Sequence, residues 1–179
     1  MDARQEKRNQ LLYAVADHIL DHGLLDASLR PMARTAGTSD RMLIYHFGSR
    51  EQLIETVLEH LTDRVKESLD LALPAMPFKD RPTAIASIMN LLRTPEFRRF
   101  NAVWLEILAK AASGKETYRK TARRIMVVFA DWLEQRVPKG EEDRRAAAWT
   151  LLAQIEGLVV MDAAGQSERA FGFEEQQSI

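Results

Sequence analysis

The stretch S-D-R-M-L-I-Y-H-F, at positions 39 to 47, places a guanidinium, a phenol and an imidazole within about two helical turns. Arg41 has the forked donor group that can bind O6 and N7 of guanine. Met42 and Ile44 have apolar atoms that can meet a thymine methyl group. These three side chains are therefore candidates for reading base edges in a major groove.

Other side chains in and around this stretch have donors that suit phosphate oxygens. Tyr45 and His46 lie within it, and Arg30 and Arg50 flank it. Phosphate contacts hold a protein in register on a duplex. Taken alone, Tyr45 and His46 could equally be ordinary surface residues, and Arg41 a solvated one. The candidate DNA-contact residues are Arg30, Ser39, Arg41, Met42, Ile44, Tyr45, His46 and Arg50.

A short helix would have to present these groups. Ser39 is a typical N-cap residue, and Asp40 places negative charge at the positive end of the helix dipole. Leu43 and Phe47 lie one turn apart and are expected to face the core. The opposite side of the helix would then face outward.

Helical patterns before and after this segment predict a three-helix unit. Apolar residues recur at helical spacing over residues 11 to 20 and again over residues 28 to 37, where Ser28 is expected to cap the helix. Two short helices joined by a tight, glycine-containing turn are the elements of a helix-turn-helix. The capping box S-R-E-Q, at residues 49 to 52, opens a longer fourth helix.

Positive charge is concentrated in the same part of the chain. The whole protein has a formal net charge of -1 at pH 7, which gives no global basic field. Residues 28 to 50, however, contain four arginines and one aspartate, a net charge of +3. Arg4, Lys7 and Arg8 could add a basic arm along a DNA backbone.

The segment S-L-R-P-M-A-R-T-A-G-T-S-D-R-M-L-I-Y-H-F-G-S-R-E-Q-L resembles the DNA-binding signature of the tetracycline-repressor (TetR) family. The typical form of that signature is A-G-V-S-x-x-x-L-Y-x-H-F-x-S-K-E-x-L, and the similarity covers residues 8 to 60. There are departures from the residues usual in the family. Ile44 stands where tyrosine is usual, Arg41 where a small residue is common, and Pro31 where an acid often closes the cap.

The resemblance implies a homodimeric transcription regulator with a variable helical ligand domain. It implies that Tyr45, His46 and Arg50 contact the DNA backbone and that base edges are within reach of Arg30, Arg41, Met42 and Tyr45. It also implies that the helix over residues 50 to 72 transmits ligand binding to the DNA-binding unit.

The stretch L-P-A-M-P-F-K-D-R-P, residues 73 to 82, contains three prolines and is the best candidate for a domain boundary. Residues 1–73 would form the DNA-binding domain with its connecting helix, and residues 74–179 the effector-binding and dimerisation domain. Beyond the prolines every pattern has helical period, and no segment alternates as a strand would. We therefore expect an all-α fold.

The second half of the chain is rich in aromatic residues. These could form ordinary core or line an apolar pocket between helices. The candidate pocket residues are Met89, Phe100, Trp104, Tyr118, Phe129 and Trp149. Glu106, Glu156 and Asp162 lie on otherwise apolar segments, and each is expected to face water rather than a polar ligand.

Gly157 interrupts the last helix at a cost of about 1 kcal/mol relative to alanine, which indicates a close approach between helices. Residues 143–164 are therefore the candidate dimer helix, packed with residues 116–136 into a four-helix bundle across a twofold axis. Burial of the glycine within one subunit is the alternative.

The residue types and spacings give little support for a catalytic or metal-binding site. Cysteine is absent, which excludes thiolate sites and disulfides. His18 and His22 lack a third metal ligand, so we expect solvated histidines, no metal and no cofactor. No acidic residue has a histidine three positions later, as a di-iron bundle requires, and no glycine-rich phosphate loop is present. The chain is not expected to be an enzyme.

The N-terminus lacks an apolar signal core, and no segment is expected to supply the roughly 20 apolar residues of a membrane span. We expect a soluble, cytoplasmic dimer that binds a palindromic double-stranded DNA operator. A small-molecule effector would release it, as in a repressor. The alternative is a helical small-molecule-binding or protein-interaction module without DNA binding.

Overall fold

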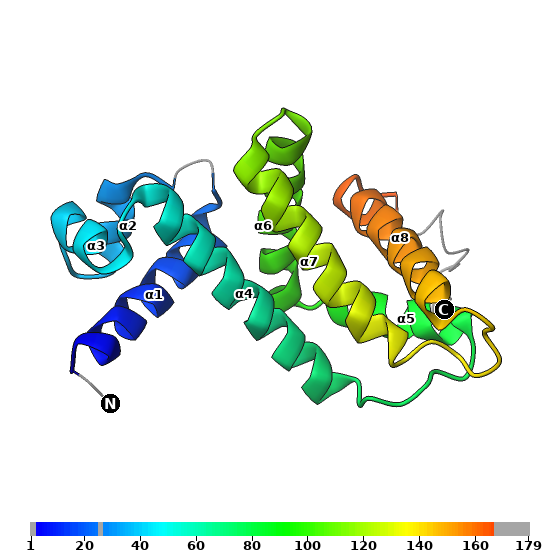
Figure 1. Cartoon of the computed structure of the whole chain (residues 1–179). Helices are drawn as coiled ribbons and strands as arrows, with labels where there is room; N and C mark the ends of the chain where they lie inside the picture. Colours follow the sequence, from blue (N-terminus) through cyan, green and yellow to red (C-terminus); the bar gives the residue numbers. More distant parts are fainter. Residues whose placement is uncertain (1–2, 25–26, 167–179) are drawn as a thin grey trace, which may run out of the picture.

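The computed structural model describes residues 3 to 24 and 27 to 166 of the chain. The described part consists of helices joined by short connections, without a strand, as the expected all-α fold requires (Figure 1). The helices are α1 Ala3–His22, α2 Leu29–Thr35, α3 Asp40–Phe47, α4 Arg50–Ala72, α5 Arg81–Leu92, α6 Pro95–Ala112, α7 Glu116–Glu134 and α8 Arg144–Ala163.

The first three helices pack into the expected helix-turn-helix unit. Gly37 has a φ of +61°, a left-handed conformation that favours glycine, and it forms the tight turn between α2 and α3. Ser39 caps α3 by accepting a 3.3 Å hydrogen bond from the Met42 amide. Leu43 is fully buried and Phe47 nearly so, which fixes the inner side of α3. Together these features hold a two-turn helix at the surface.

The expectation that the Ser28 side chain caps α2 through a hydrogen bond is wrong. Ser28 occupies the N-cap position of α2 with extended backbone, but its side chain accepts no capping hydrogen bond. An N-cap oxygen normally binds the second or third amide of the helix. The third position here is Pro31, which has no N–H, so one of the two possible donors is missing.

Helix α4 leaves the helix-turn-helix unit and extends toward the other end of the molecule (Figure 1). Ser49 caps it through the Gln52 amide at 3.1 Å, as the capping box predicted. It packs on α1 and α3 and also contacts α6 and α7. One helix therefore contacts both halves of the structure.

Helices α5 to α8 form the second half of the structure. Helix α7 packs along both α6 and α8, and α5 lies against α8 (Figure 1). Asp80 and Asp143 cap α5 and α8 through the amides three residues on, at 2.8 and 2.9 Å. Thr94 occupies the N-cap position of α6 but makes no side-chain cap hydrogen bond.

The apolar core does not divide at the predicted boundary. A first cluster of buried residues contains side chains from α1, α2, α3 and α4, together with Phe100, Val103 and Ile107 of α6. A second cluster begins with Leu69 of α4 and fills the space between α5, α7 and α8. The boundary between residues 73 and 74 stays a prediction, although α4 does end at Ala72.

Arg136, which follows α7, fastens the end of α4 to that helix. It is 1% exposed, and its guanidinium donates to Asp70 at 2.6 Å and to the carbonyls of Leu73 and Trp132. Lys66 and Trp132 also donate to Asp70, and together with Arg136 they hold the pKa of that carboxyl below its ordinary value. The buried cation is thus paired and hydrogen-bonded.

Helix α8 corrects the expectation that no segment resembles a membrane span. Within the described residues, Arg144–Ala163 is the one helix that is long and apolar enough to cross a membrane, judged by length and composition alone. Core helices of soluble proteins meet the same criteria. Here one side of the helix, including Leu151 and Ile155, is buried against α5 and α7.

Candidate DNA-binding surface and ligand pocket

The outward side of α3 carries the predicted base-reading residues. Arg41 is exposed, Met42 is 40% exposed and Tyr45 is 59% exposed. Ile44 is half-buried at the flank. The helix therefore presents a cation, a thioether and a phenol on the side opposite its buried anchors.

The N-terminal turns of α1 lie beside α3. The Arg4 guanidinium is 5.1 Å from the centre of the Tyr45 ring, and that of Arg8 is 4.8 Å from the centre of the Phe47 ring. Both distances suit cation–π contacts. Lys7 is exposed on the same turns. Positive charge from the expected basic arm is thus placed next to the recognition helix.

Arg50 has a structural task that the sequence pattern did not suggest. Its Nε and Nη2 donate to the Ala27 carbonyl at 3.0 and 2.8 Å, tying the start of α4 to the connection before α2. Its Nη1 lies 4.0 Å from the Glu51 carboxylate. Any phosphate contact by Arg50 is therefore left mainly to Nη1.

The remaining candidate DNA contacts differ in how far they are available. Arg30 is exposed on α2. The Ser39 hydroxyl already serves as the α3 cap. His46 is half-buried, and its Nδ1 is buried without a hydrogen-bond partner in the described structure, so Nε2 is the nitrogen left for a phosphate. The Tyr45 ring lies edge-on to the His46 ring, with centroids 5.1 Å apart.

The expectation of solvated histidines on α1 is wrong for His18. His18 is 5% exposed, and its Nδ1 lies 2.8 Å from the Thr35 hydroxyl at the end of α2. Its ring stacks on that of His22 at 4.3 Å. Burial and the neighbouring His22 lower the pKa of His18, while Asp21 opposes them. The described residues contain no group of three metal-ligating side chains.

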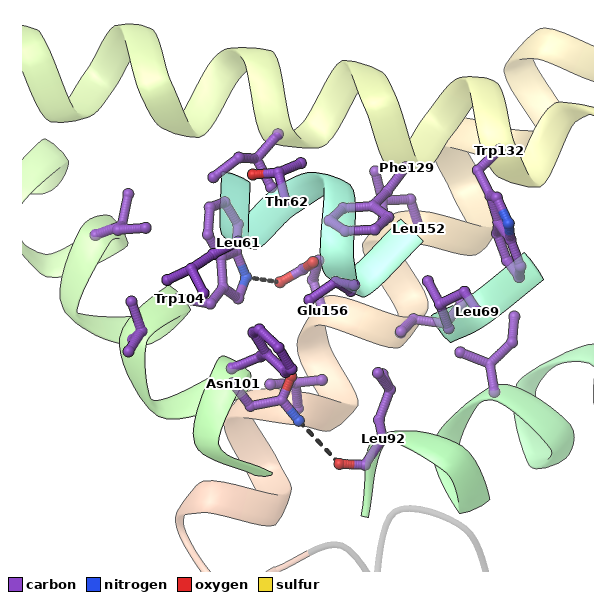
Figure 2. Close-up of a pocket in the computed structure, with 18 of the residues that line it drawn as sticks. Leu61, Thr62, Leu69, Leu92, Asn101, Trp104, Phe129, Trp132, Leu152 and Glu156 are labelled. Atoms are coloured by element: carbon purple, nitrogen blue, oxygen red, sulfur yellow. Dashed lines mark hydrogen bonds between the residues drawn. The ribbon is translucent and has the colours of Figure 1, made fainter. Parts of the chain in front are cut away.

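A pocket lies between α4, α6, α7 and α8 (Figure 2). Its cavity has a volume of about 110 Å³. Three of the candidate pocket residues line it: Phe100 and Trp104 on α6 and Phe129 on α7. Trp132, one turn beyond Phe129, also lines it, although it was not among the candidates.

Three of the predicted pocket residues lie elsewhere. Met89 is 2% exposed and packs in the second core cluster. Tyr118 is half-buried near the first turn of α7, with the Lys110 ammonium 5.5 Å from its ring centre. Trp149 is 38% exposed on α8. Each was proposed for its apolar character, and that character does not tell which of several apolar environments a helical residue occupies.

Glu156 corrects the expectation that each isolated acid faces water. Its carboxylate lies inside the pocket, where Oε2 accepts a 2.7 Å hydrogen bond from the indole N–H of Trp104 (Figure 2). Burial raises the pKa of Glu156 above its ordinary value, and the hydrogen bond from Trp104 acts in the opposite direction. The available signal was its position between Leu152, Ile155 and Val159 on the buried side of α8.

The other two isolated acids also have protein partners. Glu106 accepts a 2.7 Å hydrogen bond from the Leu24 amide, which links α6 to the connection after α1. Asp162 pairs with Arg93 at 3.1 Å. These contacts join residues 82 and 69 positions apart, so local sequence patterns could not reveal them.

An exposed apolar stripe follows the outer side of α8. Trp149, Val160 and Met161 are 38%, 52% and 46% exposed. Gly157 lies between them, and a Cβ built there would meet nothing within 4 Å in the described structure. The glycine therefore makes no close helix contact within one subunit, which removes the alternative explanation for its position.

Comparison with known proteins connects this geometry to transcription regulators. The chain is 27% identical over 161 residues to the HTH-type transcriptional regulator BetI of Rhizobium meliloti (strain 1021), covering 86% of this chain and 76% of BetI. No protein-family model matches the chain.

Two solved structures have the same fold. A transcriptional regulator of Streptomyces coelicolor A3(2) is 27% identical, with a TM-score of 0.70 over 88% of this chain and 87% of that one. A Rhodococcus protein described as a TetR-family regulator is 23% identical, with a TM-score of 0.71 over 94% of each chain. The likeness covers the helix-turn-helix and the helical bundle alike.

Proposed function

Because this chain belongs to the tetracycline-repressor (TetR) family of helix-turn-helix transcriptional regulators, we propose that it is a dimeric repressor that a small molecule releases from a palindromic operator. The observation that carries the proposal is the outward side of α3, which presents Arg41 and Tyr45 to solvent while Leu43 and Phe47 hold the helix from behind. A two-turn helix with this division between its sides can enter a major groove.

Within the groove, Arg41 is the proposed guanine contact, and Met42 and Ile44 are the proposed contacts to thymine methyl groups. Tyr45 can donate to a phosphate or a base edge, and its ring lies against Arg4 of α1. The proposed backbone contacts are made by Arg30, Ser39, His46 and Arg50.

The proposed dimer buries the outer side of α8 against the same surface of a second copy, with α7 completing a four-helix bundle. Three observations support this arrangement. The exposed stripe of α8 is apolar, the small residues Ala153 and Gly157 on it would let two helices approach closely, and Val127 of α7 is also exposed. Such a twofold contact would use the same patch on both subunits.

Release of DNA would follow from a shift between two arrangements of the dimer, one of which fits the operator. An effector that prefers the other arrangement lowers operator affinity by its differential affinity for the two, typically about 1 to 3 kcal/mol. Two elements are suited to carry the change. Helix α4 lines the pocket with Leu61 and Leu69 and packs on α3, while α6 lines it and holds Leu24 through Glu106.

Operator selection from random double-stranded DNA, followed by gel-shift titration at several salt concentrations, tests the proposal. We expect a palindrome whose half-sites are spaced by one helical turn, about 34 Å, or a multiple of it. If each subunit neutralises three or four phosphates, log K plotted against log salt should have a slope of roughly -5 to -7. Failure to enrich any sequence, with binding that does not depend on salt, would contradict DNA recognition by this surface.

A further inference from the structure

The pocket contains one feature that an apolar binding site does not require. Leucine, isoleucine, valine and aromatic side chains make up nearly all of its wall. Glu156 is the ionisable side chain among the residues that line it. Asn101 and Thr62 are also polar, but each donates a hydrogen bond to a main-chain carbonyl, of Leu92 and Leu58 respectively. The carboxylate is thus the polar group aimed into the cavity (Figure 2).

Packing alone does not explain this carboxylate. In the described structure the partner of Glu156 is the neutral N–H of Trp104, whereas the half-buried Asp162 has Arg93 and the buried Arg136 has Asp70. A glutamine would accept the same hydrogen bond through its amide oxygen and occupy the same volume. Glu156 is half-buried, with its carboxylate in an otherwise apolar pocket. Since a charge withdrawn from water without a countercharge is costly, its presence points to a positively charged partner from outside the chain.

The aromatic walls suit the same partner. Trp104 and Phe100 approach the cavity from α6, and Phe129 and Trp132 approach it from α7. The faces of such rings attract organic cations, tryptophan most strongly. In Figure 2 the Glu156 carboxylate lies between the side chains of Trp104 and Phe129. A carboxylate and aromatic rings together are the elements of a site for an alkylammonium group.

We propose that the pocket binds a small organic ammonium cation, with Glu156 as its countercharge and the surrounding aromatic rings as its walls. The proposal rests on the proposed function, in which this pocket is the effector site. The cavity volume of about 110 Å³ sets the size of the ligand. A dry cavity of about 150 Å³ in another protein holds benzene, so a head group such as trimethylammonium, with a short substituent, is of the right size.

A matched pair of probes tests the charge requirement on the full chain. Choline and 3,3-dimethylbutan-1-ol have nearly the same shape but differ in whether a positively charged nitrogen or a carbon stands at the centre of three methyl groups. Calorimetric titration of the wild type should show choline binding at least about tenfold more tightly, as a cation–π contact together with an ion pair implies. Equal binding of the two, or binding of neither, would overturn the proposal.

The residue requirement is tested with Glu156→Gln and a control, Glu96→Gln. Glu96 is exposed on α6, and its replacement makes the same change in net charge away from the cavity. Glu156→Gln should reduce the preference for choline to the part that the aromatic rings supply and leave binding of the neutral alcohol within about twofold, while Glu96→Gln should behave as the wild type. If Glu156→Gln binds choline as the wild type does, Glu156 is not the countercharge.

Gel shifts with the wild type separate this inference from the function on which it rests. A protein that binds its operator but shows no preference for choline over the alcohol refutes the ammonium site and leaves the regulator intact. A protein that binds choline selectively but selects no operator retains the site and refutes the regulator.

Trp104→Phe, which keeps an aromatic ring but loses the N–H, should retain a preference for the cation.

Discussion

On α3, neighbouring residues have opposite tasks. Leu43 is fully buried against the other helices of the helix-turn-helix unit, whereas Arg41 is exposed two residues earlier. Replacing Leu43 by alanine would cost about 2 to 5 kcal/mol of stability, as for other buried leucines. Replacing Arg41 removes no core contact. The two substitutions therefore separate folding from recognition.

Arg41→Ala should leave the thermal stability nearly unchanged and relax the preference at one base pair of each half-site by about 1 to 3 kcal/mol. Operator selection and competition gel shifts with the variant measure this directly. Arg98→Ala, which removes an exposed arginine from α6, is the control for net charge. An unaltered base preference in Arg41→Ala would return Arg41 to the role of a solvated helix residue.

Glu156 should affect stability in a pH-dependent way. Burial raises its pKa in the folded state above the value of 4.5 that is ordinary for glutamate. The unfolded chain therefore loses this proton at lower pH than the folded chain, and folding becomes less favourable as pH rises from 4.5 toward the raised pKa. Glu156→Gln removes that loss.

Thermal melts of wild type and Glu156→Gln should accordingly differ more at pH 7 than at pH 4, with the variant the more stable at pH 7. The same substitution is expected to weaken choline binding, so stability and ligand recognition should change in opposite directions. An equal difference in melting temperature at both pH values would mean that ionisation of the Glu156 carboxylate does not destabilise the folded protein. Glu96→Gln serves again as the exposed control.

At the level of elements, α6 belongs to both functional regions. Trp104 lines the pocket, and two residues later Glu106 accepts the Leu24 amide of the connection after α1. Gly23 makes room for that contact, since a Cβ there would lie 2.3 Å from Oε1 of Glu106. Its φ of +76° also favours glycine. A movement of α6 would therefore be transmitted to the connection after α1 through this hydrogen bond.

Glu106→Ala leaves the Leu24 amide without this acceptor and should cost about 1 to 3 kcal/mol of stability. It should also reduce the change in operator affinity that an effector causes. Glu106→Gln keeps an acceptor oxygen and should retain most of both properties. Urea titrations and gel shifts with and without effector compare the two variants, and identical behaviour of both would exclude coupling through this hydrogen bond.

The elements themselves were largely predictable, because helix periods, caps and glycine stops are local signals. Ser39 and Ser49 cap their helices as expected, and Leu43 and Phe47 face the core. Apart from the Ser28 cap, which is a local error, the errors arise where distant segments meet. Nothing near Arg50 in the sequence indicates its bond to Ala27, and nothing near Glu156 indicates Trp104, which is 52 residues away.

Aromatic residues show the same limit in a different form. Trp132 on α7 lines the pocket, whereas Trp149 is exposed on α8. Helical period separates the sides of one helix, but it does not say which neighbour each side meets. Helix α8 is apolar on several sides at once, so periodicity could not distinguish core, pocket and exposed stripe.

For the whole molecule, the arrangement in Figure 1 separates three regions. Helix α3 lies at one end, α8 lies at the other, and the pocket lies between α4, α6, α7 and α8. If α8 pairs two subunits, their α3 helices are placed at a distance that depends on how α4 and α6 sit. The spacing of operator half-sites would then report the state of the pocket.

Val160→Arg places a charge in the exposed apolar stripe of α8 and should convert the dimer into monomers of unchanged fold. Light scattering after size-exclusion chromatography, together with circular dichroism, measures both properties. Operator affinity should fall with dimerisation, because one α3 reads only half of a palindrome. Glu96→Gln, which raises the net charge by the same amount at an exposed position of α6, is the control for altered surface charge. A dimeric Val160→Arg protein would place the subunit contact elsewhere.

The small volume of the cavity also limits what the regulator can detect. A compound that fits without displacement of the walls has roughly six or seven non-hydrogen atoms, and the most efficient ligands gain about 1.5 kcal/mol for each. Even that ceiling corresponds to a dissociation constant near 10⁻⁷ M, and ordinary compounds fall well short of it. Such a sensor would respond to an abundant metabolite at micromolar to millimolar levels and would reset quickly once its supply declines.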